Sequence, residues 1–179
     1  MKFFCFQRDR PGAFALRMKC LEDHWSYLER WSEQLVVRGP TFEGDVPSGS
    51  VYIVDVATPA EARAFVFEEP AYQAGVYRDV LLRRWQDALH RTTDGPRGDS
   101  TAGKHFLVVG LGAGVHESEK TQDTKNLVAF GTLLSDDASK WLGTAALLQA
   151  PDADAASAIL TTDRYSHIEV CDWQFGGRR

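Results

Sequence analysis

His24 is the side chain of this sequence whose type and position best suit proton transfer. It lies in the segment CLEDHW, residues 20–25, which is expected to be helical. An imidazole near its unperturbed pKa accepts or gives a proton at cellular pH. A carboxylate is then needed to fix its tautomer and to stabilise the imidazolium. Asp9 and Asp45 are the candidates, because each lies at the end of an expected element.

Each of these residues also has a purely structural interpretation. His24 falls at the rim of the apolar helix face, where it could simply pack on Trp25 or Trp31. Asp9 could cap the start of the helix, and Asp45 lies in a glycine-rich stretch that is typical of a turn. The residues alone leave the catalytic and the packing interpretations open.

Two further side chains on this helix could take part in chemistry. Arg17 lies seven residues before His24, and its guanidinium could hold an anionic substrate or remain a solvated surface charge. Cys20 lies one turn before His24, so a Cys/His nucleophile is conceivable, but a buried or half-buried thiol fits a lone cysteine better.

Signatures of metal or nucleotide chemistry are missing from the sequence. The stretch GLGAG, residues 110–114, resembles a dinucleotide-binding loop, but Val115 stands where the third glycine is required. The five histidines form no ligand pair on one helix, and the acidic residues lack calcium-loop spacing. We therefore expect no metal and no cofactor.

Composition excludes several classes of partner. The 179 residues carry a net charge of −5 and no basic cluster, which argues against nucleic-acid binding. The longest apolar run, FLVVGLGAGV, is about half of what a membrane helix needs. The three cysteines form no paired motif. A cytoplasmic protein that binds a small organic molecule is the expectation.

The elements that must position these residues follow the order β-α-β-β-α-β in each half, which is the ferredoxin-like pattern. In the first half we expect strands at 2–7, 35–40, 50–56 and 76–85, a helix from about 11 to 28, a loop at 41–49 and a helix at 58–69. In the second half we expect strands at 105–111, 127–134, 143–150 and 165–175, with helices at 116–126 and 152–160.

The two halves align with each other. An offset of 92 residues carries His24 to His116 and Asp45 to Asp137, together with Leu35, Val36 and Gly39 to identical residues. Several matches in one ungapped frame indicate a duplication. We predict one repeat at 1–86, a linker at 87–103 and a second repeat at 104–179.

Several segments of the first half resemble the YCII-related (YciI-like) domain family. They are DRPGAFALR (9–17), LVVRGP (35–40), GSVYIVDV (49–56) and EEPAYQAGVY (68–77), together with the helical His24. The similarity runs from residue 1 to about 86. The second half resembles the family weakly, keeping His116, Gly131 and Asp137 only.

The resemblance implies a dimeric α+β barrel, which the fused repeats would build within one chain. It also implies a cofactor-free His/Asp site, matched here by His24 and Asp9, in a lyase- or dehydrochlorinase-like enzyme. We expect a lyase or isomerase acting on a small, anionic organic substrate that Arg17 would hold. The alternatives are a non-catalytic binding or accessory protein and, as a minor case, a haem-binding barrel.

The halves are expected to be unequal. Aligning Trp85 with Trp173 shows that the second half has lost about six residues where AYQAGVY stands in the first. This segment should therefore wall the first cleft, with Tyr72 and Tyr77 as aromatic contacts, while the site around His116 should be degenerate. Whether the chain is a monomeric pseudo-dimer or a homodimer stays open.

Overall fold

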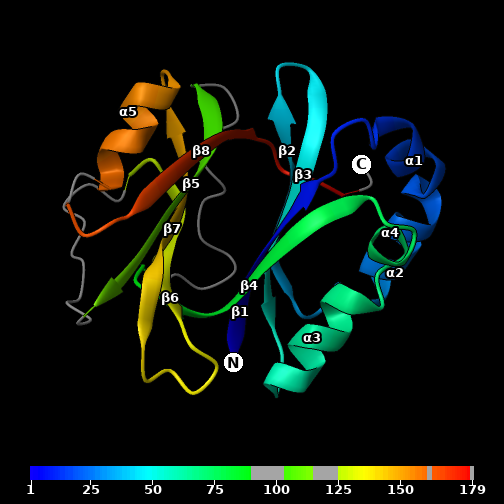
Figure 1. The fold of residues 1–179 in the computed structure, drawn as a ribbon, viewed down its shortest axis with the longest axis horizontal. Helices are drawn as coiled ribbons and strands as arrows, with labels where there is room; N and C mark the ends of the chain where they lie inside the picture. Colours follow the sequence, from blue (N-terminus) through cyan, green and yellow to red (C-terminus); the bar gives the residue numbers. More distant parts are fainter. Residues whose placement is uncertain (90–102, 115–124, 161–162, 178–179) are drawn as a thin grey trace. The chain divides into compact units, whose positions relative to one another are not determined.

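The structure is a computed structural model, and it describes residues 1–89, 103–114, 125–160 and 163–177. The chain divides into two compact units, which are treated one at a time. The first consists of residues 1–84 and 175–179, and the second of residues 85–174. Both units are mixed α+β, with antiparallel strands and short helices (Figure 1).

The first unit follows the expected ferredoxin-like order of elements. Its elements are β1 (Lys2–Asp9), α1 (Phe14–Lys19), α2 (Leu21–Arg30), β2 (Leu35–Glu43), β3 (Val46–Asp55), α3 (Pro59–Phe67), α4 (Pro70–Gln73) and β4 (Tyr77–Asp87). The strands pair antiparallel in the order β2-β3-β1-β4. The short, aromatic β1 therefore lies inside the sheet, as its uninterrupted apolar run predicts.

One face of this sheet packs against the helices. The buried cluster joins Phe3, Cys5, Tyr52 and Val54 of the strands to Tyr27 and Leu28 of α2 and to Ala62, Phe65 and Val66 of α3. Phe65 is its centre, since its ring lies edge-on to Trp31 at 5.3 Å and to Tyr52 at 5.4 Å between ring centroids. This packing fixes α2 over β3.

Two local predictions for this unit were wrong. The helix expected from about 11 to 28 is divided at Cys20 into α1 and α2, and Ala13 rather than Asp9 occupies the N-cap position, without a side-chain cap. The stretch 41–49, expected to be a loop, is mostly strand, because β2 and β3 form a hairpin whose turn is Gly44 and Asp45. Gly44 has φ +61°, which glycine adopts without strain.

The second unit repeats the strand order of the first. Its elements are β5 (Lys104–Gly114), β6 (Leu127–Leu134), β7 (Trp141–Ala150), α5 (Ala153–Ser157), a 3-10 turn (Ala158–Leu160) and β8 (His167–Trp173). Its order, β6-β7-β5-β8, again places the first strand between the third and the fourth. Residues 116–124 of the expected helix, including His116, and most of the expected linker lie outside the described residues.

Among the helices that the structure describes, none is long and apolar enough to cross a membrane.

Candidate functional site

A cavity of about 240 Å³ lies in the first unit, between α2 and the strands β2 and β3. It is lined by Arg17, Leu21, His24, Trp25, Leu28, Arg38, Gly39, Pro40, Ser50, Tyr52, Phe175, Gly176 and Gly177. The apolar face expected on the first helix is divided accordingly. Phe14 and Met18 are exposed by 47% and 45%, whereas Leu21 and Trp25 form part of the cavity wall and Leu28 is buried.

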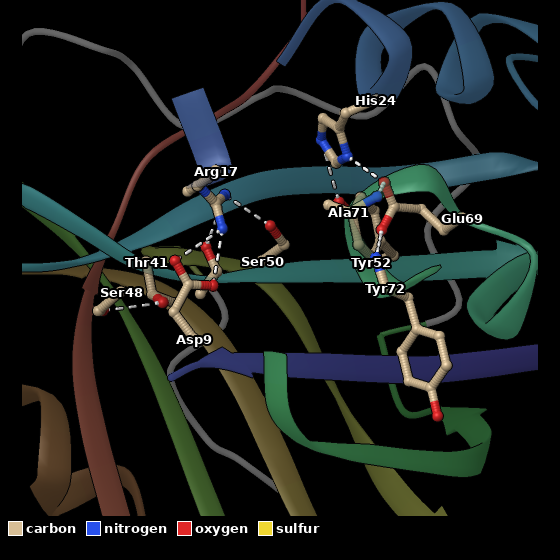
Figure 2. A network of polar contacts seen from close by, with 11 residues as sticks. Asp9, Arg17, His24, Thr41, Ser48, Ser50, Tyr52, Glu69, Ala71 and Tyr72 are labelled. Atoms are coloured by element: carbon tan, nitrogen blue, oxygen red, sulfur yellow. Dashed lines mark hydrogen bonds and ion pairs between the residues drawn. The ribbon is translucent and has the colours of Figure 1, made fainter. Parts of the chain in front are cut away.

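His24 is paired with a carboxylate that the sequence prediction did not name. Its Nδ1 lies 2.7 Å from Oε1 of Glu69, and Figure 2 shows the two side chains pointing toward each other. Glu69 precedes α4 and is 1% exposed. The carboxylate that contacts His24 is therefore that of Glu69, 45 residues away along the chain, and not that of Asp9 or Asp45 as predicted.

The Glu69 carboxylate is held in place by the start of α4. Its Oε1 accepts a hydrogen bond from the backbone N–H of Ala71 at 3.0 Å, and its Oε2 accepts one from that of Tyr72 at 2.8 Å. Burial opposes ionisation, but the hydrogen bond and charge of His24 and these two N–H groups outweigh it and lower the pKa of Glu69. Glu69 is therefore an ionised, fixed acceptor.

This arrangement sets the tautomer of His24. An ionised carboxylate only accepts hydrogen bonds, so in neutral His24 the proton belongs on Nδ1 and the lone pair on Nε2. Nε2 lies 3.5 Å from the hydroxyl of Tyr52, at the outer limit of a hydrogen bond. Burial and the nearby charge of Glu69 raise the pKa of Tyr52, which therefore remains a hydrogen-bond donor.

Arg17 and Asp9 form a second buried pair at the cavity. Nη1 of Arg17 lies 2.8 and 3.1 Å from the two Asp9 oxygens, and Nη2 donates to Ser50 Oγ at 2.7 Å and to the Gly49 carbonyl at 3.2 Å (Figure 2). Arg17 is thus not the solvated charge of the structural alternative. Burial raises the pKa of Asp9, although Arg17 opposes this effect. Asp9 neutralises Arg17 and makes no described hydrogen bond to His24.

The other predicted site residues lie away from the cavity lining. Asp45 is exposed in the β2–β3 turn. The ring of Tyr72 packs on Phe67, with 5.0 Å between ring centroids, and Figure 2 shows it directed away from His24. Tyr77 is buried, being 5% exposed, and does not line the cavity. Only the backbone N–H of Tyr72 serves the site, through Glu69.

Sequence reasoning missed three contributors: Glu69, Arg38 and the C-terminal residues 175–177. The signal for Glu69 was present, because an acidic residue directly before Pro70 is typical of a helix N-cap. Arg38 was hidden inside the strand LVVRGP. No local pattern could have brought residues 175–177 to β2, where the Gly176 N–H donates to the Arg38 carbonyl at 3.0 Å.

Within the part of the chain that the structure describes, no group of three or more His, Cys, Asp or Glu residues could hold a metal ion.

Comparison with known proteins relates the chain to several solved structures. 5-Chloro-2-hydroxyhydroquinone dehydrochlorinase from Burkholderia phenoliruptrix AC1100, in complex with 2,5-dihydroxybenzoquinone, is 28% identical over 51% of this chain and 100% of its own, with a TM-score of 0.48. A protein provisionally assigned as a chlorite dismutase is 11% identical over 97% of this chain and 95% of its own, with a TM-score of 0.57. A mutant chlorite dismutase from Candidatus Nitrospira defluvii, in complex with cyanide, is 10% identical over 97% of this chain and 90% of its own, with a TM-score of 0.56.

At such low identity the two chlorite dismutase structures show a shared fold and nothing about activity. No curated protein matches the sequence significantly. The family model described as the YCII-related domain matches residues 1–86, the stretch that carries His24, Arg38 and Glu69. Residues 1–86 of the chain are therefore a YCII-related domain.

Proposed function

We propose that the first unit is a cofactor-independent acid–base enzyme of the lyase or isomerase type, acting on a small organic molecule. His24 is the general base, and Glu69 is the carboxylate that orients it. The observation that carries this proposal is the 2.7 Å contact between His24 Nδ1 and the buried Glu69, at the wall of a cavity. A base held by a second group in this way is the arrangement that proton abstraction requires.

In the proposed reaction, Nε2 of His24 takes a proton from a substrate carbon. The electron pair of the broken C–H bond then forms a double bond. In a lyase it expels the leaving group from the neighbouring carbon, and in an isomerase the imidazolium returns the proton to a different carbon. Glu69 stabilises the imidazolium in the interval. The Tyr52 hydroxyl, which remains protonated because its pKa is raised, can donate to a substrate oxygen that gains charge.

The alternative is a binding or accessory protein that uses the same cavity without chemistry. Haem binding fits the cavity poorly. The cavity has a volume of about 240 Å³, whereas pockets for drug-sized ligands have volumes of about 300–1,000 Å³. A haem is larger than such ligands. Purified protein without a Soret band would agree with this conclusion.

The test is a thermal-shift screen of the intact chain against small metabolites, followed by turnover assays on every compound that raises the melting temperature. His24→Gln should lower turnover about 10²–10⁴-fold, the usual effect of losing one acid–base group. His116→Gln is the matched control, because the repeat alignment pairs it with His24, and it should leave turnover unchanged.

Turnover that survives in His24→Gln would overturn the acid–base proposal. Compounds that bind the wild type and are never converted would instead support the binding-protein alternative.

A further inference from the structure

We propose that Arg38 binds the carboxylate of a single-ring substrate and thereby determines which molecules the cavity accepts. This inference rests on the proposed function, because it names the substrate class of the same site. Arg38 comes from β2 and lines the cavity together with His24.

Arg38 and Arg17, the two arginines of the cavity lining, differ in their partners among the described residues. Arg17 is neutralised by Asp9 at 2.8 Å, and His24 is joined to Glu69 at 2.7 Å. Arg38 is half-buried, and among the described residues no hydrogen bond or ion pair engages its guanidinium. A carboxylate of the ligand would supply the partner that this half-buried guanidinium lacks among the described residues.

The C-terminal residues hold the Arg38 side chain at the cavity. Gly176 donates its N–H to the Arg38 carbonyl at 3.0 Å and packs against Gly39 and Pro40. Gly177 approaches the guanidinium so closely that an added Cβ would lie 2.6 Å from Nη2. Because residue 177 has no side chain, the tail can lie directly against one side of the guanidinium. A planar fork restrained in this way is prepared for bidentate binding of a carboxylate.

The other residues that line the cavity favour a ligand with a ring. They are mostly apolar and aromatic: Leu21, Trp25, Leu28, Pro40, Tyr52 and Phe175. A volume of about 240 Å³ is below the range of cavities that hold drug-sized ligands, so one ring with small substituents suits it. Together, an apolar wall and the Arg38 guanidinium fit a cyclic or aromatic carboxylate.

The experiment is isothermal titration calorimetry of the intact chain with benzoate and with benzamide, its neutral analogue. Wild-type protein should bind benzoate at least tenfold more tightly than benzamide, because a hydrogen bond to a charged group adds about that much. Arg38→Gln should abolish the preference while keeping the melting temperature. Arg63→Gln, an exposed arginine on α3 outside the cavity, is the matched loss of one positive charge and should keep the preference.

An unchanged preference in Arg38→Gln, or a wild-type protein that does not prefer benzoate, would overturn the assignment of Arg38. His24→Gln separates this proposal from the proposed function. It should still prefer benzoate, because Arg38 carries the selection, even though its turnover is lost. Loss of turnover in His24→Gln with no role for Arg38 would leave the acid–base proposal standing and the carboxylate site refuted.

Discussion

Glu69 performs two tasks with one side chain. It caps α4 through the N–H groups of Ala71 and Tyr72, and it fixes the His24 ring. His24 could be predicted from the sequence, because residue spacing alone places a histidine next to the apolar positions of a helix. The partner of His24 could not be predicted from the sequence, since the pairing depends on the start of α4 lying next to α2, 45 residues away along the chain. Asp9, one of the two predicted partners, neutralises Arg17 instead.

Replacing Glu69 should change stability in a pH-dependent way. The pKa of Glu69 is lowered from 4.5 in the folded state, so its ionised form stabilises the fold above that pH. This contribution disappears as the pH falls through the lowered pKa. Glu69→Gln loses it at every pH, so the gap in melting temperature between wild type and variant should be widest near pH 7 and should narrow below pH 4.5. A gap in melting temperature that stays constant with pH would contradict a lowered pKa of Glu69 in the folded state.

Replacing Asp9 tests whether its buried pair with Arg17 stabilises the fold. Asp9→Asn leaves Arg17 as a buried cation without a charged partner, which typically costs about 3–5 kcal/mol of the free energy of unfolding. The matched control is Asp79→Asn, which breaks the Arg8–Asp79 pair, whose aspartate side chain is 47% exposed. It should cost about 1 kcal/mol or less. Denaturant titration of both variants measures the difference, and equal losses would contradict the buried-pair account.

At the level of elements, periodicity and punctuation predicted most strands. KFFCFQ was expected at 2–7 and is the start of β1, and LVAFGTLL forms β6 with the predicted bounds. The division of the first helix at Cys20 was invisible, because four-residue hydrogen-bond spacing persists on both sides. The Cys20 N–H bonds to the Leu16 carbonyl, and the His24 N–H bonds to that of Cys20. The apolar period therefore continues across the break.

The C-terminal tail is the element whose position depends most on close contacts. An added Cβ at Gly176 would lie 2.9 Å from the Gly39 Cα and 3.2 Å from Pro40, so Gly176→Ala should displace the tail from β2. The hydrogen bond from residue 176 to the Arg38 carbonyl should then weaken. Hydrogen exchange measures this directly, since the amide of residue 176 should be protected in wild type and exchange quickly in the variant. Equal protection in both would show that the tail is not held as described.

At the scale of the whole molecule, the two units share one strand order, with the first strand between the third and the fourth in each. The 92-residue offset predicts this, because equivalent sequences fold alike. Asp45 and Asp137, which the offset pairs, both lie in the connection between the second and third strands of their units. The duplication itself, the barrel within one chain and the degenerate site at His116 stay predictions.

The predicted barrel within one chain has a measurable size. A compact body of 179 residues should have a radius of gyration of about 16 Å. Small-angle scattering combined with light scattering should find that value at a mass of 20.0 kDa if the chain is a monomeric pseudo-dimer. A mass of twice that size would favour the homodimer, and a monomer with a much larger radius would contradict the single barrel.

The proposed function depends on Glu69 holding His24 so that Nε2 is the base. Its most direct test is the tautomer of His24, read from nitrogen-15 correlation spectra of the labelled ring, which needs no substrate. We expect neutral His24 to carry its proton on Nδ1, donating to Glu69, and Nε2 to bear the lone pair. The Glu69→Gln variant should lose this strict preference. A wild-type His24 protonated on Nε2 would contradict its role as the base, because the nitrogen available to a substrate could then accept no proton.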